Sequence, residues 1–156
     1  MRQALGTSTA SSRRQASPRP FLKWVGGKRR LLDQIRPLLP QRINRYFEPF
    51  IGGGALFFDQ RPSSARLWDV NNELINCYVA VRDHLDELIV ALRAHRYEKE
   101  YYYALRATDP KSLSPVQAAA RTICLNRTGF NGLYRVNRSG NFNVPFGRYT
   151  NPTICD

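Results

Sequence analysis

Three consecutive glycines that follow a short apolar segment constrain this chain more than any other feature of its 156 residues. Arg45 to Phe50 is predicted to form a buried strand, and Gly52 to Gly54 then lead into a helix that begins near Ala55. Because glycine has no Cβ, the backbone N–H groups of such a turn can come close to a ligand. Glycine turns are also common as plain connections, so the pattern alone leaves a ligand site and a tight turn open.

A second strand and helix are predicted after the glycine turn. Ala65 to Val70 is a candidate strand, and Asn71 or Asn72 can cap the helix that comes next. Apolar residues then recur at the spacing of one long helix, whose apolar face is expected to pack on the sheet. The order strand, helix, strand, helix predicts an α/β fold with parallel strands. The apolar face consists of Leu74, Ile75, Tyr78, Val79, Leu85, Leu88, Ile89 and Leu92.

The second half of the chain has a different character. Tyr97 to Ala107 and Ser114 to Asn126 are predicted helices. The sequence after them is rich in Asn, Gly, Arg and aromatic residues. Leu133 to Asn137 and Asn141 to Val144 are predicted as the two arms of a hairpin around the loop Arg138 to Gly140.

Acidic residues flank the glycine turn. Asp69 ends the second predicted strand, where a carboxylate can accept hydrogen bonds from a ribose diol or can cap the following helix. Glu48 precedes the glycines in a turn that reads Glu-Pro-Phe-Ile-Gly-Gly-Gly rather than Gly-x-Gly-x-x-Gly. An acid at this position repels a pyrophosphate, which disfavours a nicotinamide-dependent oxidoreductase. S-adenosylmethionine carries a sulfonium and an ammonium group, so electrostatics favour it over NAD.

A cationic segment precedes the glycine turn. Lys28, Arg29 and Arg30 lie at the start of a predicted helix, where the helix dipole disfavours positive charge. A carboxylate or phosphate docked on the Gly26–Gly27 backbone and Lys28 would remove this conflict, and simple solvation of the cations is the alternative. Trp24, judged by residue type alone, is more typical of a core residue than of a ligand platform.

The formal net charge of +12 is concentrated in two basic regions, residues 1–47 and 121–156, which flank a near-neutral middle. This distribution favours a polyanionic partner over a merely solvated surface. Three scattered cysteines and two histidines indicate neither a disulfide framework nor a metal site, which fits a reducing cytoplasm. No apolar run approaches the length of a membrane span. Residues 1–19 are predicted to be a disordered basic tail.

Ordered motifs of the chain together resemble those of the Dam-type (D12 class) adenine-N6 DNA methyltransferases. The resemblance runs from about Pro20 to the C-terminus, and several motifs in order are far more specific than any one of them. The motifs are Trp24 to Lys28, Phe47 to Gly54, Asp69 to Asn71, Asn126 to Asn137 and Gly140 to Tyr149.

The resemblance implies S-adenosylmethionine as the cofactor and double-stranded DNA, with the target base flipped out, as the partner. It implies neither a metal nor a membrane, and it implies action in the cytoplasm on the bacterial nucleoid. The implied cofactor-binding residues are Trp24, Lys28, Glu48, Phe50, Gly52, Gly54 and Asp69. The implied DNA-binding residues are Arg127, Asn131, Leu133, Arg135, Arg138 and Arg148.

Arginines of the implied DNA-binding set can hold phosphates or read guanine edges. Phe130, Asn131 and Tyr134 offer planar groups that can fill the gap left by a flipped base. For any single one of these residues, a role in a solvated loop with aromatic packing is the alternative.

The fold implied by the resemblance is a partial Rossmann-like S-adenosylmethionine-dependent methyltransferase fold with an inserted helical and hairpin DNA-recognition region. In this division residues 1–19 are the tail, residues 20–95 the cofactor-binding α/β part, and residues 96–156 a truncated target-recognition region.

The Asp-Pro-Pro-Tyr segment with which this family carries out methyl transfer does not occur in the sequence, where Asp109-Pro110 continues with Lys111. No catalytic residue is therefore assigned, and we expect an N-terminal fragment that is inactive alone, with an exposed sheet edge, marginal stability and a tendency to associate. A noncatalytic basic DNA-binding module is the alternative function. GATC is a plausible recognition sequence, and both a housekeeping and a restriction-modification role remain open.

Overall fold

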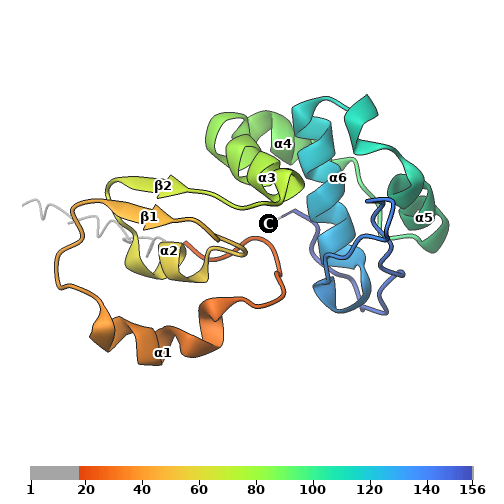
Figure 1. Cartoon of the computed structure of the whole chain (residues 1–156). Helices are drawn as coiled ribbons and strands as arrows, with labels where there is room; N and C mark the ends of the chain where they lie inside the picture. The colour runs from red at the N-terminus through yellow and green to blue at the C-terminus, as the bar shows by residue number, and fades with distance from the viewer. Residues whose placement is uncertain (1–17, 156) are drawn as a thin grey trace, which may run out of the picture.

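The computed structural model describes residues 18–155, so the predicted basic tail lies almost entirely outside the described residues. A part with a small sheet and a part made of helices lie next to each other (Figure 1). Within the described range no helix has the length and apolar character needed to cross a membrane. In chain order, the elements are a 3-10 turn (Lys28–Leu31), α1 (Leu32–Ile35), a 3-10 turn (Arg36–Leu38), β1 (Tyr46–Glu48), α2 (Ala55–Gln60), β2 (Ala65–Leu67), α3 (Asn72–Asp83), α4 (Leu85–Arg93), α5 (Lys99–Ala107), a 3-10 turn (Pro110–Ser112), α6 (Pro115–Thr128) and a 3-10 turn (Phe130–Gly132).

The sheet consists of β1 and β2, which pair in parallel with Phe47 opposite Arg66. The predicted parallel arrangement is confirmed, although each strand is shorter than predicted. The prediction that Arg45 to Phe50 is a buried strand is wrong for Phe47, because side chains alternate across the pleat and its ring is 53% exposed while Tyr46 is buried.

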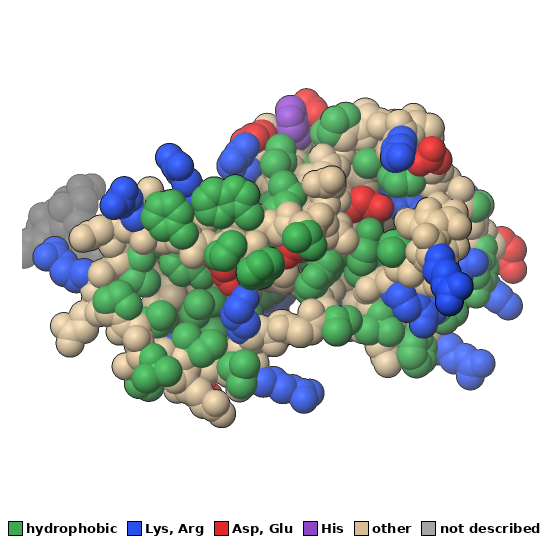
Figure 2. All heavy atoms as spheres, in the orientation of Figure 1, with side chains coloured by type: hydrophobic (Ala, Val, Ile, Leu, Met, Phe, Trp, Pro, Cys, Tyr) green, Lys and Arg blue, Asp and Glu red, His purple; other side chains and the backbone are tan. Residues whose placement is uncertain are grey.

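Apolar side chains gather on the surface over β1 and β2 (Figure 2). Phe47 stacks on Trp68 with ring centroids 6.3 Å apart, and Phe50 and Val70 are also exposed. One face of the sheet thus presents large apolar groups to solvent. The expected exposed edge of the sheet is a different feature and stays a prediction.

The predicted long helix is two helices, α3 and α4, which are separated at His84. The φ of −136° and ψ of 39° at His84 take the chain out of the helical region, and Asp86 and Glu87 occupy the first turn of α4, where the dipole favours them. Asn71 caps α3 by accepting a hydrogen bond from the Leu74 N–H at 2.9 Å, as predicted. Periodicity alone did not reveal the break, because the apolar positions keep nearly the same spacing across it.

Helix α3 packs mainly along α6 rather than on the sheet, which corrects the expected packing. Small residues line this contact, so the two helices approach closely. The main core joins Leu74, Cys77 and Ala80 of α3 with Ala119 and Ile123 of α6. Residues from both predicted parts, 20–95 and 96–156, therefore share one core, and the boundary between them stays a prediction.

Helix α6 confirms the predicted second-half helix and forms the centre of the helical part. Ser114 and Gln117 form a reciprocal capping box at its start, and Pro115 occupies its first turn. A second core packs against the far side of α6 and consists of Tyr102, Leu125, Phe142 and Val144.

The predicted hairpin is present as a short open ladder rather than as two regular strands. Val136 and Phe142 form an antiparallel bridge, and the Asn137 N–H donates to the Asn141 carbonyl at 2.9 Å. The Asn137 side chain accepts hydrogen bonds from the N–H groups of Ser139 and Asn141, which closes the loop.

Candidate cofactor and DNA-binding sites

The glycine turn between β1 and α2 has a backbone that only glycine adopts readily. Gly52 and Gly54 have φ values of 53° and 72°. A Cβ at Gly52 would lie 3.2 Å from Cδ1 of Trp24, and a Cβ at Gly54 would lie 2.6 Å from the hydroxyl of Tyr78. The Tyr78 hydroxyl also donates to the Gly52 carbonyl at 3.0 Å. Close packing of two aromatic side chains therefore already requires these glycines.

Lys28 lies over the start of the turn and holds a buried carboxylate. Its ammonium donates to Oε1 of Glu48 at 2.9 Å and to the carbonyl of Phe50 at 3.0 Å. Glu48 is 6% exposed and also accepts from the Tyr46 hydroxyl at 2.6 Å. Burial, with a further contribution from Glu48, raises the pKa of Tyr46, so its phenol stays protonated as a donor. One of the two sequence-based alternatives placed a docked carboxylate or phosphate beside Lys28. In the structure the carboxylate of Glu48 occupies such a position.

Asp69 fastens the turn to the start of α3. Its two carboxylate oxygens accept from the N–H groups of Gly52 and Asn71, each at 3.0 Å. The alternative that Asp69 caps the helix is wrong, since Asn71 takes that role. Two backbone donors fix the carboxylate of Asp69 at the edge of the turn.

These groups meet at a cavity of about 250 Å³, here called the turn cavity. Five of the predicted cofactor residues line it, namely Trp24, Lys28, Phe50, Gly52 and Asp69. The other two predicted residues, Glu48 and Gly54, do not line it: Glu48 accepts a hydrogen bond from Lys28, and Gly54 is the N-cap of α2. Sequence reasoning missed two lining residues, Val25 and Ala55, each next to a predicted site residue in the chain, and it included Ile51 only as part of the turn from Glu48 to Gly54. Gly26, Gly27 and Gly53 complete the lining.

Trp24 connects the turn cavity with the predicted recognition region. Its indole stacks on the ring of Tyr134 with centroids 4.8 Å apart and planes 26° apart. Tyr134 also contacts Phe142 edge to face at 5.6 Å, and burial raises the pKa of its phenol to about 12. Asn71 and Glu73, near the start of α3, also influence the pKa of the Tyr134 hydroxyl. The ring of Tyr134 therefore contacts both Trp24 in the cavity wall and Phe142 in the predicted recognition region.

The predicted DNA-binding residues do not gather at one point. Arg135 and Arg138 lie on the hairpin, where the guanidinium of Arg135 donates to Oδ1 of Asn143 at 2.8 Å. Asn131 and Arg148 line a separate cavity of about 390 Å³ together with aromatic rings. Leu133 packs half-buried against the second core.

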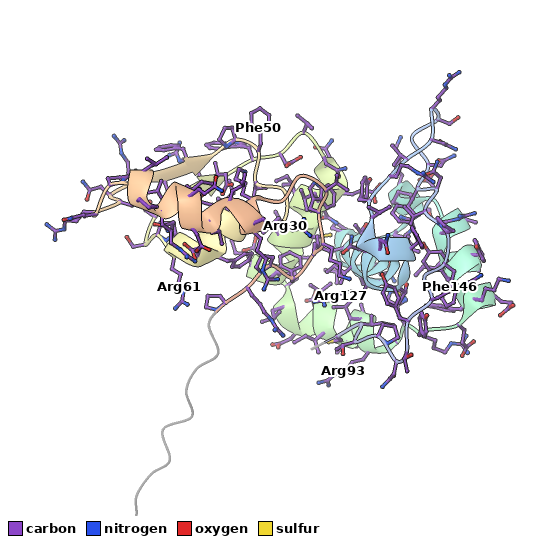
Figure 3. The ribbon with its side chains drawn as sticks, turned by 90° about the horizontal axis from the view of Figure 1, so that it is seen from below. Arg30, Phe50, Arg61, Arg93, Arg127 and Phe146 are labelled. Carbon is purple, nitrogen blue, oxygen red and sulfur yellow. The ribbon has the colours of Figure 1, made fainter. Side chains whose placement is uncertain are left out.

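Arg127, on the last turn of α6, lies apart from the other predicted DNA-binding residues. It lines a cavity with Lys23, Arg29 and Arg30; Figure 3 labels Arg127 and Arg30. Sequence reasoning did not connect Lys23, Arg29 and Arg30 with Arg127, because more than 90 residues of chain separate them.

Two further observations concern possible sites elsewhere. A cavity of about 500 Å³ with an apolar lining lies beside β2, bounded by residues such as Phe57, Trp68 and Tyr78. Across residues 18–155, no three His, Cys, Asp or Glu side chains form a group that could hold a metal ion.

The fold and the turn cavity together define a class of protein. A glycine turn at the carboxyl end of a parallel strand, beside a carboxylate at the end of the next strand, is typical of α/β proteins that bind nucleotide-like ligands. Residues 24–156 match the family of D12 class N6 adenine-specific DNA methyltransferases, and the chain belongs to this family. Membership of this family rules out the alternative that the chain is a nicotinamide-dependent oxidoreductase.

Comparison with individual proteins agrees with this assignment. The chain is 52% identical over 144 residues to the type II methyltransferase M1.LlaDCHI of Lactococcus lactis subsp. cremoris, covering 88% of this chain and 51% of the relative. It is 42% identical over 159 residues to the type II methyltransferase M.MjaIII of Methanocaldococcus jannaschii, covering 88% and 55%. It is 43% identical over 138 residues to the DNA adenine methylase of Escherichia coli K12, covering 86% and 49%. The chain thus spans about half the length of these relatives.

Proposed function

We propose that this chain binds S-adenosylmethionine in the turn cavity and belongs to a protein that transfers the methyl group to adenine N6 in DNA. The observation that carries the proposal is the convergence of Trp24, Lys28, Phe50, Gly52 and Asp69 on one cavity. The cofactor would supply a methyl group on a positively charged sulfur. The residues of the chain would bind and orient it.

The chemistry of the lining fits such a ligand. The carboxylate of Asp69 can accept hydrogen bonds from a ribose diol, and the Lys28 ammonium can hold a carboxylate. Aromatic rings at Trp24 and Phe50 can stack on a purine. Phe50 is 67% exposed and lies at the edge of the molecule in Figure 3, so its ring is free to cover a ligand.

The size of the turn cavity refines this proposal. Its volume of about 250 Å³ is below the roughly 300–1,000 Å³ that is typical of small-molecule sites. We therefore expect the ligand to reach beyond the cavity, with Phe50 and Val25 closing over the part that protrudes.

DNA is the proposed second partner, engaged by the segment from Arg127 to Arg148. The positive net charge and the relatives' names support this role. We propose methyl transfer for the whole protein and place it in the cytoplasm, where prokaryotic DNA lies. Because the 156 residues contain no Asp-Pro-Pro-Tyr segment, we expect the chain by itself to bind but to leave DNA unmethylated.

Titration calorimetry with S-adenosylmethionine tests the cofactor site. Phe50→Ala should weaken binding by about 1–3 kcal/mol, the contribution of one aromatic stack on a base. Phe47→Ala is the matched control, because Phe47 is also exposed, lies three residues away and does not line the cavity. Asp69→Asn should weaken binding further, with circular dichroism confirming that the fold is kept.

Equal affinity of the wild type and Phe50→Ala, or a larger effect of Phe47→Ala, would contradict the site. DNA binding by the chain with no response to S-adenosylmethionine would favour the noncatalytic DNA-binding module instead. Radiolabelled methyl transfer to duplex DNA by the 156 residues alone would overturn the expectation that they only bind.

A further inference from the structure

A basic groove lies between the segment around Arg29 and the end of α6. Figure 3 labels three of the arginines that line it, Arg30, Arg61 and Arg127. Two adjoining cavities of about 490 and 190 Å³ form it and share Arg19, Pro20, Arg29 and Ala55 in their linings. Arg127 and Arg30 line the larger cavity and Arg61 the smaller one. We call this feature the arginine groove. Its cations are Arg19, Lys23, Arg29, Arg30, Arg61 and Arg127.

The acidic residue that lines the arginine groove, Asp59, already has a cationic partner outside it. Arg36 donates to Asp59 through Nε at 3.0 Å and through a terminal nitrogen at 2.6 Å. Hydrogen bonding from Arg36, reinforced by the charge of Arg36, lowers the pKa of Asp59 against the opposing effect of burial. The carboxylate of Asp59 is thus largely neutralised by Arg36, so it leaves the positive charge of Arg29 and Arg30 in the groove uncompensated.

Arg29 and Arg30 are exposed and make no ion pair with any acid in the part of the chain that the structure describes. Lys23 extends over the ring of Tyr149, with its ammonium 5.4 Å from the centroid. Several like charges in one concave surface repel each other unless an anion lies between them. Arginine favours phosphate in particular, because its planar donors match two phosphate oxygens.

The floor of the arginine groove is rigidly joined to the recognition region. The Lys23 N–H donates to Oδ1 of Asn126 at 2.9 Å, and the Asn126 amide donates to the carbonyls of Lys23 and Gly132, both at 2.8 Å. Asn126 is buried and directly precedes Arg127. Lys23 of the groove is thereby held in a fixed position relative to α6 and the loop at Gly132.

We propose that the arginine groove binds the phosphate backbone of the DNA duplex at a position flanking the recognised sequence. This inference rests on the proposed function and adds a second, sequence-independent contact surface to it. An extended polyanion fits better than a single phosphate, because the cations line two joined cavities rather than one point. Such contacts hold and position DNA without reading bases.

The salt dependence of DNA binding tests this inference. Fluorescence anisotropy would follow the full chain on duplexes of roughly 25 base pairs, with and without GATC, over roughly 50 to 300 mM salt. The double variant Arg29→Gln, Arg30→Gln should reduce the slope of log K against log salt by about 1.8, or ~0.9 for each lost phosphate contact. At about 0.1 M salt this corresponds to at least tenfold weaker binding, equal on both duplexes.

Arg93→Gln is the matched control, since Arg93 is an exposed arginine on α4 that lines neither cavity of the groove. An unchanged slope in the double variant, or an equal change in Arg93→Gln, would overturn the arginine groove. Arg135→Gln on the hairpin and calorimetry with S-adenosylmethionine report on the proposed function separately. If both of those behave as proposed while the double variant binds DNA like the wild type, only the groove is wrong.

Discussion

Replacing Tyr134 by alanine removes the ring that joins the turn cavity to the recognition region. The variant loses the stack on Trp24 at 4.8 Å and the edge contact with Phe142 at 5.6 Å. A fully buried aromatic residue replaced by alanine costs about 3–5 kcal/mol of unfolding free energy. Tyr134 is half-buried, so we expect about 2–3 kcal/mol, of which the ring contacts contribute roughly half.

The same substitution should weaken cofactor binding without touching the cofactor. Trp24 lines the turn cavity and loses the ring that fixes its orientation. Ordering one side chain on binding costs about 0.5–1.5 kcal/mol, so the dissociation constant for S-adenosylmethionine should rise about 2- to 10-fold. Urea denaturation and titration calorimetry measure the two effects independently.

Two control variants separate positioning from general destabilisation. Tyr134→Phe keeps both ring contacts and loses only the hydroxyl interactions with Asn71 and Glu73, so cofactor affinity should be retained. Tyr103→Ala removes another half-buried tyrosine, which packs on the second core away from Trp24. Cofactor affinity that is equally weak in Tyr103→Ala, or unchanged in Tyr134→Ala, would refute the reasoning.

Further substitutions test the glycine turn, the capping of α6 and the buried thiol. Gly54→Ala should lower the unfolding free energy by about 2–5 kcal/mol, because the new Cβ meets the Tyr78 hydroxyl. Gly140 has a similar positive φ but open space around it, so Gly140→Ala should lower the unfolding free energy by only about 1–2 kcal/mol. Equal losses of stability in thermal denaturation would contradict the packing argument. Ser114→Ala removes half of a capping box and should lower the unfolding free energy by about 1 kcal/mol, and Ser114→Thr should recover most of it. Burial raises the pKa of Cys124 to about 11, so stability present below about pH 9 should fall as the pH rises towards 11. Cys124→Ala should make this fall shallower in urea titrations at several pH values, and an identical slope would speak against it.

Local patterns in the sequence predicted the order of strands and helices, but not all of their boundaries. The glycine turn and the apolar segments around it predict two parallel strands, and the Ser114-Pro115 start predicts α6. The break at His84 was missed because apolar residues keep helical spacing through it, and only the backbone angles there show where α3 ends. The packing of α3 along α6 depends on contacts between residues some forty positions apart, such as Cys77 with Ala119, which periodicity does not encode.

The sequence predicted several residues that line the candidate site, but not which residues they contact in the folded chain. Asp69 and Lys28 were identified from their chemistry and Trp24 from the family resemblance, and the structure places all three at the turn cavity. The pairing of Lys28 with Glu48 could not be derived from spacing, because either a ligand or a protein carboxylate satisfies the same cation. The stack of Trp24 on Tyr134 joins positions 110 residues apart, and only the folded chain shows it.

The turn cavity and the arginine groove adjoin and share part of their lining. Trp24, Gly27, Gly53 and Ala55 line both cavities. A shift of Trp24 therefore changes the shape of both at once, and Tyr134 of the predicted recognition region contacts Trp24 by stacking on it. Linkage requires that any effect of DNA on cofactor affinity equals the effect of cofactor on DNA affinity. We therefore expect Trp24 to couple the two proposed ligands, because it lines both cavities and its indole is held by the stack on Tyr134.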